Sequence, residues 1–114
     1  MATIRREGDE VVVKLNDLER LGALHGDVRV PATAVRTVRL TEQPFREIRG
    51  IRAPGTGVPR VLALGTWRYS GGKDFVVVHR NEPGLVVELD GAGFRRLIVS
   101  SHDAALLADA LQPA

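Results

Sequence analysis

The chain has 114 residues, of which 44% are hydrophobic and 26% charged, with no cysteine. These figures fit one compact soluble domain, and the lack of cysteine excludes disulfides, thiolate nucleophiles and zinc–thiolate sites. The longest apolar run, Ala104 to Ala108, is far shorter than the ~18 residues that a membrane span needs. No apolar stretch follows the basic pair near Met1, so we expect no signal peptide and a cytoplasmic location.

Charge is unevenly distributed along the chain. Fourteen of the sixteen cationic residues are arginine, which keeps the isoelectric point high although the net charge is only +2. Between Arg29 and Arg68 there are eight arginines and only two acidic residues, whereas the remainder of the chain is acidic in balance. The molecule is therefore expected to carry a dipolar surface.

The first half of the chain contains short strands and turns. Three strands are predicted from alternating or β-branched apolar residues, at Glu10–Leu15, Asp27–Val30 and Val35–Thr41. Asn16 to Leu21 starts with a capping side chain and predicts a short helix, and Pro31 to Ala34 predicts a turn. Residues 1–9 show no such pattern and are predicted to be a tail.

Residues Gly50 to Arg60 form the most irregular stretch. Pro44 to Ile48, just before it, favours a single helical turn. The stretch itself contains three glycines and two prolines, which predicts an irregular loop. A loop of this length inside a small domain is often functional or mobile.

The second half has a cleaner pattern. Four further strands are predicted at Val61–Tyr69, Asp74–Arg80, Leu85–Asp90 and Phe94–Ser100, and each joint between them has the residues of a hairpin turn. A terminal amphipathic helix follows, with a capping serine before it and Ala104, Leu107 and Leu111 forming an apolar stripe. Residues 10–112 are expected to form the domain, and 113–114 a second tail.

This order of elements resembles the bacterial pleckstrin-homology-like (PH-like) domains. The resemblance rests on the strand and turn Val28 to Val38, on Leu85 to Leu89, and on Leu97 to Ser100 leading into the helix Asp103 to Leu111. It implies a mainly β fold with a C-terminal α-helix: a bent antiparallel sheet or partly open barrel of about seven strands, capped by the helix. It also implies a closed homo-oligomer.

No catalytic, metal or cofactor site is predicted. Ser101, His102 and Asp103 have the residue types of a hydrolase triad, but adjacent residues at a helix start cannot converge as a triad must. Capping explains them. The three histidines are too scattered for a recognisable metal pattern.

The arginines around the Gly/Pro stretch are the main candidates for an anion site. They are Arg46, Arg49, Arg52 and Arg60, and guanidinium groups can hold phosphate or carboxylate through two hydrogen bonds. The alternative is that they only keep the surface charged and soluble. Nucleic acid is not expected, because the net charge is small and aromatic residues are not interleaved with basic ones.

Two predicted strands are apolar on both faces, at Val61 to Leu64 and Phe75 to Val78. A strand with one solvent-exposed face should alternate apolar and polar residues instead. Another part of the protein must therefore cover the second face of these strands. The terminal helix is expected to cover part of it, and a subunit interface the rest. The interface candidates are Val61, Ala63, Trp67, Tyr69, Val76 and Val78.

The sequence therefore predicts a non-enzymatic binding module that self-associates, with a protein or a small anion as its partner. One alternative is a peripheral adaptor that binds anionic lipid head groups through residues 46–60. A second alternative is a small-barrel enzyme or carrier.

Overall fold

The computed structural model describes residues 2–113, which form nine strands and two α-helices. The strands are β1 Thr3–Glu7, β2 Glu10–Lys14, β3 Val28–Pro31, β4 Val35–Thr41, β5 Ile51–Val58, β6 Leu62–Tyr69, β7 Gly72–His79, β8 Gly84–Ala92 and β9 Phe94–Ser100. The helices are α1 Asp17–Ala23 and α2 Ala104–Ala110, and two short 3-10 turns are η1 Ala32–Ala34 and η2 Pro44–Glu47.

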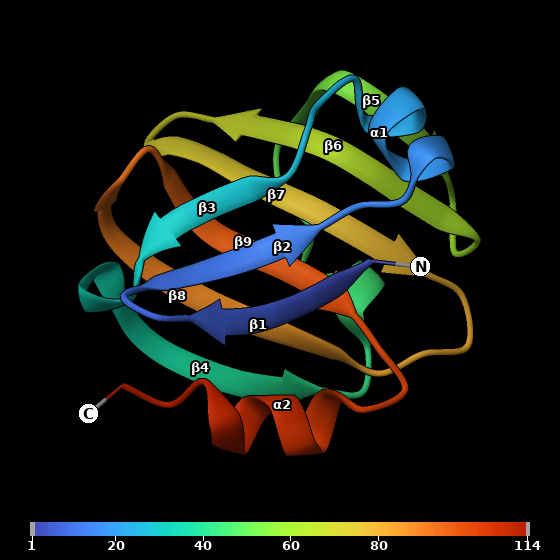
Figure 1. Ribbon diagram of the computed structural model, residues 1–114. Helices are drawn as coiled ribbons and strands as arrows, with labels where there is room; N and C mark the ends of the chain where they lie inside the picture. The colour runs from blue at the N-terminus through green and yellow to red at the C-terminus, as the bar shows by residue number, and fades with distance from the viewer. Residues whose placement is uncertain (1, 114) are drawn as a thin grey trace.

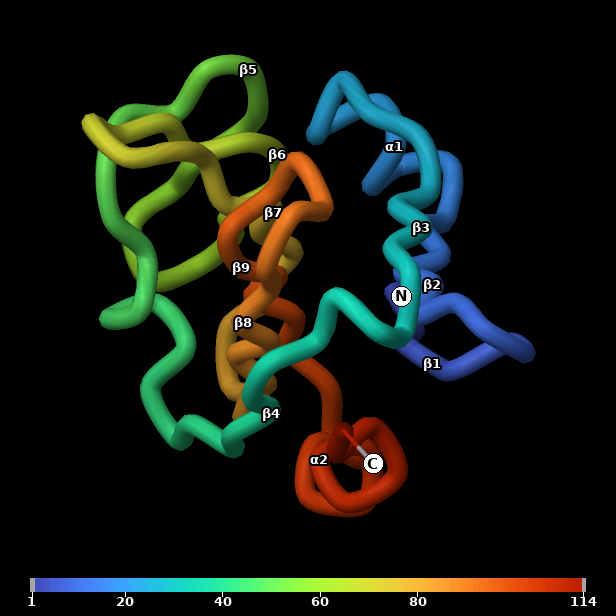
Figure 2. Tube along the Cα trace, turned by 90° about the vertical axis from the view of Figure 1, so that its left-hand side faces the viewer, coloured from blue at the N-terminus to red at the C-terminus, as the bar shows by residue number. Residues whose placement is uncertain are grey.

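The strands make two layers. A three-stranded sheet in the order β1-β2-β3 lies across a six-stranded sheet in the order β4-β8-β9-β7-β6-β5 (Figure 1). In the perpendicular view the two layers lie side by side, with β5 on the side away from the small sheet and α2 below both layers (Figure 2). The predicted mainly β fold with a C-terminal helix is confirmed, and the two sheets do not close into a barrel.

The main core lies between the two layers. Alternate residues of the central strands point into it, among them Phe75 and Val77 of β7 and Leu97 and Val99 of β9, all fully buried. Ile4 and Val13 of the small sheet pack against the same cluster.

A second cluster lies on the opposite, outer face of the large sheet. It contains Ala63, Trp67, Val76, Val78, Val86 and Ile98. The central strands are therefore buried on both faces, as their unbroken apolar runs predict. The cover is not α2, whose buried residues belong to the main core; it is the segment around η2, through Phe45 and Ile48.

Helix α2 closes the gap between the layers, where it contacts β4, β1 and β8. Its buried side chains are Ala104, Ala108 and Leu111, while Leu107 lies half-buried at the margin. The lid is thus present, and the predicted stripe is buried at Ala104 and Leu111; Leu107 packs against the core only partly buried, and Ala108 is buried in addition.

The predicted tail, residues 1–9, contains a strand; Met1 lies outside the described residues. β1 pairs with β2 along Thr3 to Glu7, and Ile4 is 1% exposed. The prediction failed because β1 is an edge strand whose remaining side chains are mostly polar and exposed, so its sequence lacks an apolar alternation.

Residues 50–60 are not an irregular loop. Ile51 to Val58 form edge strand β5, which pairs with β6 with a register shift between Arg52 and Gly55. An edge strand tolerates proline and glycine because one side of its backbone has no neighbouring strand to hydrogen-bond.

One pair of strands is parallel, whereas the resemblance implied antiparallel pairing. β7 runs parallel to β9, because the joint Arg80 to Pro83 passes over the end of β9 and places β8 one strand further away. That joint is therefore not the predicted hairpin. The Ser101 N–H donates to the Pro83 carbonyl at 2.9 Å, which holds the joint against the end of β9.

We predict that Gly65→Ala destabilises the protein. Gly65 has φ +131°, and a methyl group there would lie 2.7 Å from the Cα of Gly55 on the paired strand. The expected loss is about 1–3 kcal/mol of unfolding free energy, measured by urea denaturation. Gly26→Ala is the control, since no atom lies within 4 Å of its added methyl group. Equal stability of the two variants would contradict the close approach of β5 and β6.

We also predict that Leu111→Asp lowers the melting temperature strongly, whereas Leu106→Asp does not. Leu111 is 5% exposed and Leu106 is 72% exposed, although both belong to the same terminal helical segment. Placing a carboxylate at the buried position should cost roughly 3–5 kcal/mol, against less than about 0.5 kcal/mol at the exposed one. Calorimetry of both variants makes the comparison, and similar melting temperatures would show that α2 does not close the core.

Candidate functional site

A recess lies on the outer face of the six-stranded sheet, and we call it the outer groove. Its volume is about 800 Å³. Ala63 and Trp67 form the floor, and the walls are residues 42–48 around η2, the β5–β6 hairpin, and the joint at residues 81–83. The groove thus lies where the cover given by Phe45 and Ile48 ends.

Three of the four predicted anion-binding arginines line this groove: Arg46, Arg52 and Arg60. Within residues 2–113 none of these three side chains forms an ion pair with a carboxylate. Arg52 donates to the carbonyl oxygen of Gly57 at 3.2 Å. The groove therefore combines an apolar floor with guanidinium groups that lack an acidic partner.

The fourth arginine, Arg49, has a different place. Its Nε lies 3.2 Å from Oδ2 of Asp74, a fully buried carboxylate at the start of β7. Its guanidinium also stacks 4.2 Å from the centre of the Tyr69 ring and donates to the Tyr69 hydroxyl at 2.8 Å. The charge of Arg49 is thus already neutralised by Asp74, so Arg49 has a structural role and is not available to bind an anion in the groove.

Asp74 is the centre of this buried network. It accepts from Arg96 Nε at 3.0 Å and from the Tyr69 hydroxyl at 2.5 Å, in addition to Arg49. Three side chains that donate to one buried carboxylate offset the free energy that its desolvation costs.

The same network holds η2 on the sheet. Arg96 of β9 donates to the Glu47 carbonyl oxygen at 2.6 Å, and Arg39 of β4 forms an ion pair with the Glu47 carboxylate at 2.6 Å. The hydrogen bond from Arg39 lowers the pKa of Glu47 below its usual range, against the effect of burial. This hydrogen bond and this ion pair therefore position the wall that bounds the outer groove.

The predicted interface residues lie mostly inside the chain. Val76 and Val78 are fully buried, Ala63 and Trp67 nearly so, and Tyr69 is held by Asp74. The segment around η2 covers part of the outer face through Phe45 and Ile48, and Ala63 and Trp67 remain at the floor of the outer groove. Val61 is the exposed member of the set.

Sequence reasoning missed Glu82, which lines the outer groove from the β7–β8 joint. Its side chain is 2% exposed, and Oε1 accepts from the Ser100 hydroxyl at 3.0 Å. Oε2 is buried without a hydrogen bond; His102 Nε2 approaches it to 3.2 Å without the alignment of one. Its polar neighbours Arg80 and Asn81 and the following Pro83 are typical of an exposed turn, so nothing in the sequence signals its burial.

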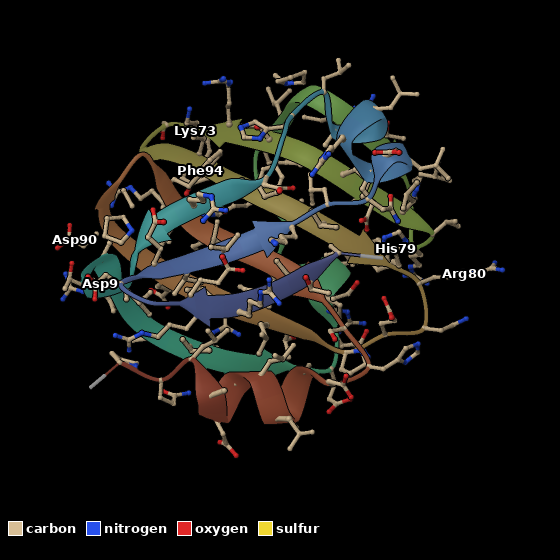
Figure 3. All side chains as sticks on the ribbon, in the orientation of Figure 1. Asp9, Lys73, His79, Arg80, Asp90 and Phe94 are labelled. Carbon is tan, nitrogen blue, oxygen red and sulfur yellow. The ribbon has the colours of Figure 1, made fainter. Side chains whose placement is uncertain are left out.

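The residues just before α2 do not converge as a triad. The Ser101 hydroxyl accepts from the Asp103 N–H at 3.1 Å, and His102 faces Glu82 instead. His79, at the far end of β7 (Figure 3), lies 2.8 Å from the buried carboxylate of Glu19. Among residues 2–113 no three His, Asp or Glu side chains are grouped so as to hold a metal ion.

No protein-family model, curated protein or solved structure matches this chain. In the part of the chain that the structure describes, neither helix has the length and apolar character needed to cross a membrane. Any functional conclusion must therefore come from the outer groove itself.

We predict that Tyr69, the only tyrosine of the chain, titrates at a higher pH in the folded protein than in urea. Burial raises its pKa, and the hydrogen bond to Asp74 raises it further. Because the folded state then holds the phenolic proton more tightly, this group's contribution to stability is complete below about pH 10 and is lost as the pH rises above it. Tyrosinate absorbance against pH measures the effect, and coincident titrations would contradict the Asp74 contact.

Proposed function

We propose that this protein is a non-enzymatic binding module that takes an anionic ligand with an apolar body in the outer groove. The observation that carries the proposal is the set of arginines without acidic partners beside Trp67. Arg36, Arg39 and Arg49, from the same basic stretch, are all paired with carboxylates. The groove arginines retain free donors, which match a carboxylate, sulfonate or phosphate.

The size of the groove favours this function. A volume of about 800 Å³ lies within the usual range for ligand sites. Trp67 and Ala63 supply an apolar floor, of which Trp67 is 8% exposed, and the arginines supply orientation. Arginine stays protonated at neutral pH, so these groups serve binding and charge stabilisation and not proton transfer.

Two features favour a free ligand over a lipid surface. Arg46, Arg52 and Arg60 surround a recess instead of forming one flat basic face, and Arg49 is occupied by Asp74. Self-association would have to use other apolar side chains, of which α1 exposes Leu18, Leu21 and Leu24.

Fluorescence of Trp67, the only tryptophan in the chain, tests the proposal directly. Anilinonaphthalene sulfonate has an apolar ring system and one anionic group, and it accepts energy from a nearby tryptophan. We expect saturable energy transfer from Trp67, with binding weakened on the order of tenfold by Arg46→Gln combined with Arg52→Gln.

Arg36→Gln is the matched control, because it removes the same charge from an exposed pair with Asp90 outside the groove. If the control weakens binding as much as the double variant, or if the double variant binds normally, the proposed site is wrong. A parallel arm sediments the protein with phosphatidylglycerol or phosphatidylcholine vesicles. Binding to the acidic vesicles that the double variant loses would replace the free ligand with a lipid surface.

A further inference from the structure

Exposed apolar side chains gather at two places on the molecule. Within residues 2–113, eight large apolar side chains are exposed. Three of them, Leu18, Leu21 and Leu24, belong to α1 and its C-terminal cap and are 66–79% exposed. Two more, Val58 and Val61, lie at the end of the β5–β6 hairpin, where Val58 lines the outer groove. The other three belong to β4, β5 and α2 and stand apart from these two groups.

The leucines of α1 add little to the fold. Polar groups fix the helix instead, since Glu19 completes a capping box with Asn16 and accepts from the Ala2 N–H at 2.9 Å. Leu24 caps the helix with φ 52°, a conformation that favours glycine and is costly for leucine. Exposed leucines on a helix held this firmly indicate a surface for contact with another molecule.

The leucines of α1 have acidic surroundings. Residues 16–27 contain three acidic residues and one arginine. Arg20 donates to both carboxylate oxygens of Asp27, at 3.1 and 3.2 Å, and approaches Asp17 only to 3.9 Å. The Asp17 side chain is fully exposed and lies one helical turn from Leu21. The surface of α1 thus combines an anionic group with an apolar body.

The outer groove has the opposite charge. It is lined by three exposed arginines and one exposed glutamate, while its second glutamate, Glu82, is buried against His102. An acidic surface with leucines therefore matches both the charge of the groove and its floor of Ala63 and Trp67. Two α1 surfaces facing each other would bring like charges together, and an anionic membrane would repel the same surface.

The chain cannot place α1 in its own groove. The helix contacts β5 and β6, and the Thr56 hydroxyl donates to the Gly22 carbonyl at 2.7 Å. A methyl group on Gly22 would lie 2.8 Å from Leu64, which belongs to the core between the layers. Ala63, the next residue of β6, belongs to the cluster on the outer face. The sheet therefore separates α1 from the groove, and α1 lies on the side of the small sheet (Figure 2).

Resting on the proposed function, we infer that the ligand of the outer groove is the α1 surface of a second copy of this chain. Leu18, Leu21 and Leu24 follow one another at a spacing of three residues, as in helices that insert their apolar side chains into a groove. In this contact the leucines pack on Trp67, and the Asp17 carboxylate accepts hydrogen bonds from the groove arginines. One copy supplies the helix and the other supplies the groove, so the contact is heterologous.

Sedimentation velocity of the full chain from about 5 to about 500 µM tests the inference. We expect association that increases with concentration and that Leu18→Gln combined with Leu21→Gln weakens about tenfold or more. Leu106→Gln is the matched control, because Leu106 is 72% exposed on α2 and should not affect association. A chain that stays monomeric over this range would overturn the inference, as would a control that weakens association equally.

A mixture of two variants tests which surfaces meet. The groove variant, Arg46→Gln with Arg52→Gln, keeps an intact helix surface, and the leucine variant keeps an intact groove. Each should be monomeric alone, and an equimolar mixture should form a heterodimer, because each chain supplies one intact half of the contact. Association of the groove variant alone would show that helices pair with each other. That result, or a mixture that stays monomeric, would overturn the inference.

Binding of anilinonaphthalene sulfonate separates this inference from the proposed function. If the sulfonate binds in the groove while the chain is monomeric, the inference is wrong and the proposed function stands. If the groove variant changes neither sulfonate binding nor association, the proposed function itself is wrong.

Discussion

The buried carboxylate of Asp74 is the interaction on which the outer face depends. It collects donors from Arg49, Arg96 and Tyr69, and Arg96 in turn reaches the backbone at Glu47. A buried ion of this kind is stable only when its donors are all in place, because desolvation alone costs several kcal/mol. The network therefore requires the segment from η2 to Arg49 to lie across the sheet in one position, and this position sets the edge of the apolar cover.

Where that cover stops, the groove begins. Phe45 and Ile48 seal one part of the outer cluster, while Trp67 and Ala63 are left as the floor of a recess. Asp74 and Glu47 neutralise Arg39, Arg49 and Arg96, whereas the groove arginines form no ion pair within residues 2–113. The same ion pairs thus explain both the shape of the site and which of its cations remain available, so stability and binding have one structural origin.

The functional argument rests on this site and not on a fold relationship. No comparison identifies a PH-like domain, and the parallel pairing of β7 with β9 departs from the antiparallel arrangement that the resemblance implied. Folds of one architecture host many functions, whereas unpaired guanidinium groups beside an apolar floor have a definite chemistry. That chemistry is the basis for proposing an anionic ligand.

The local pattern of apolar and polar residues alone predicted most strands and both helices. It also showed that the strands with two apolar faces need cover on both sides, because side-chain periodicity reports burial residue by residue. It could not reveal β1 or β5, since edge strands are specified by the partner that they join and need little apolar pattern of their own. Nor could it separate Arg49 from Arg46, Arg52 and Arg60, which look alike along the chain. Only the tertiary structure brought Asp74 to Arg49 and placed Glu82 in the lining of the outer groove, because these residues are distant in sequence from their neighbours in space.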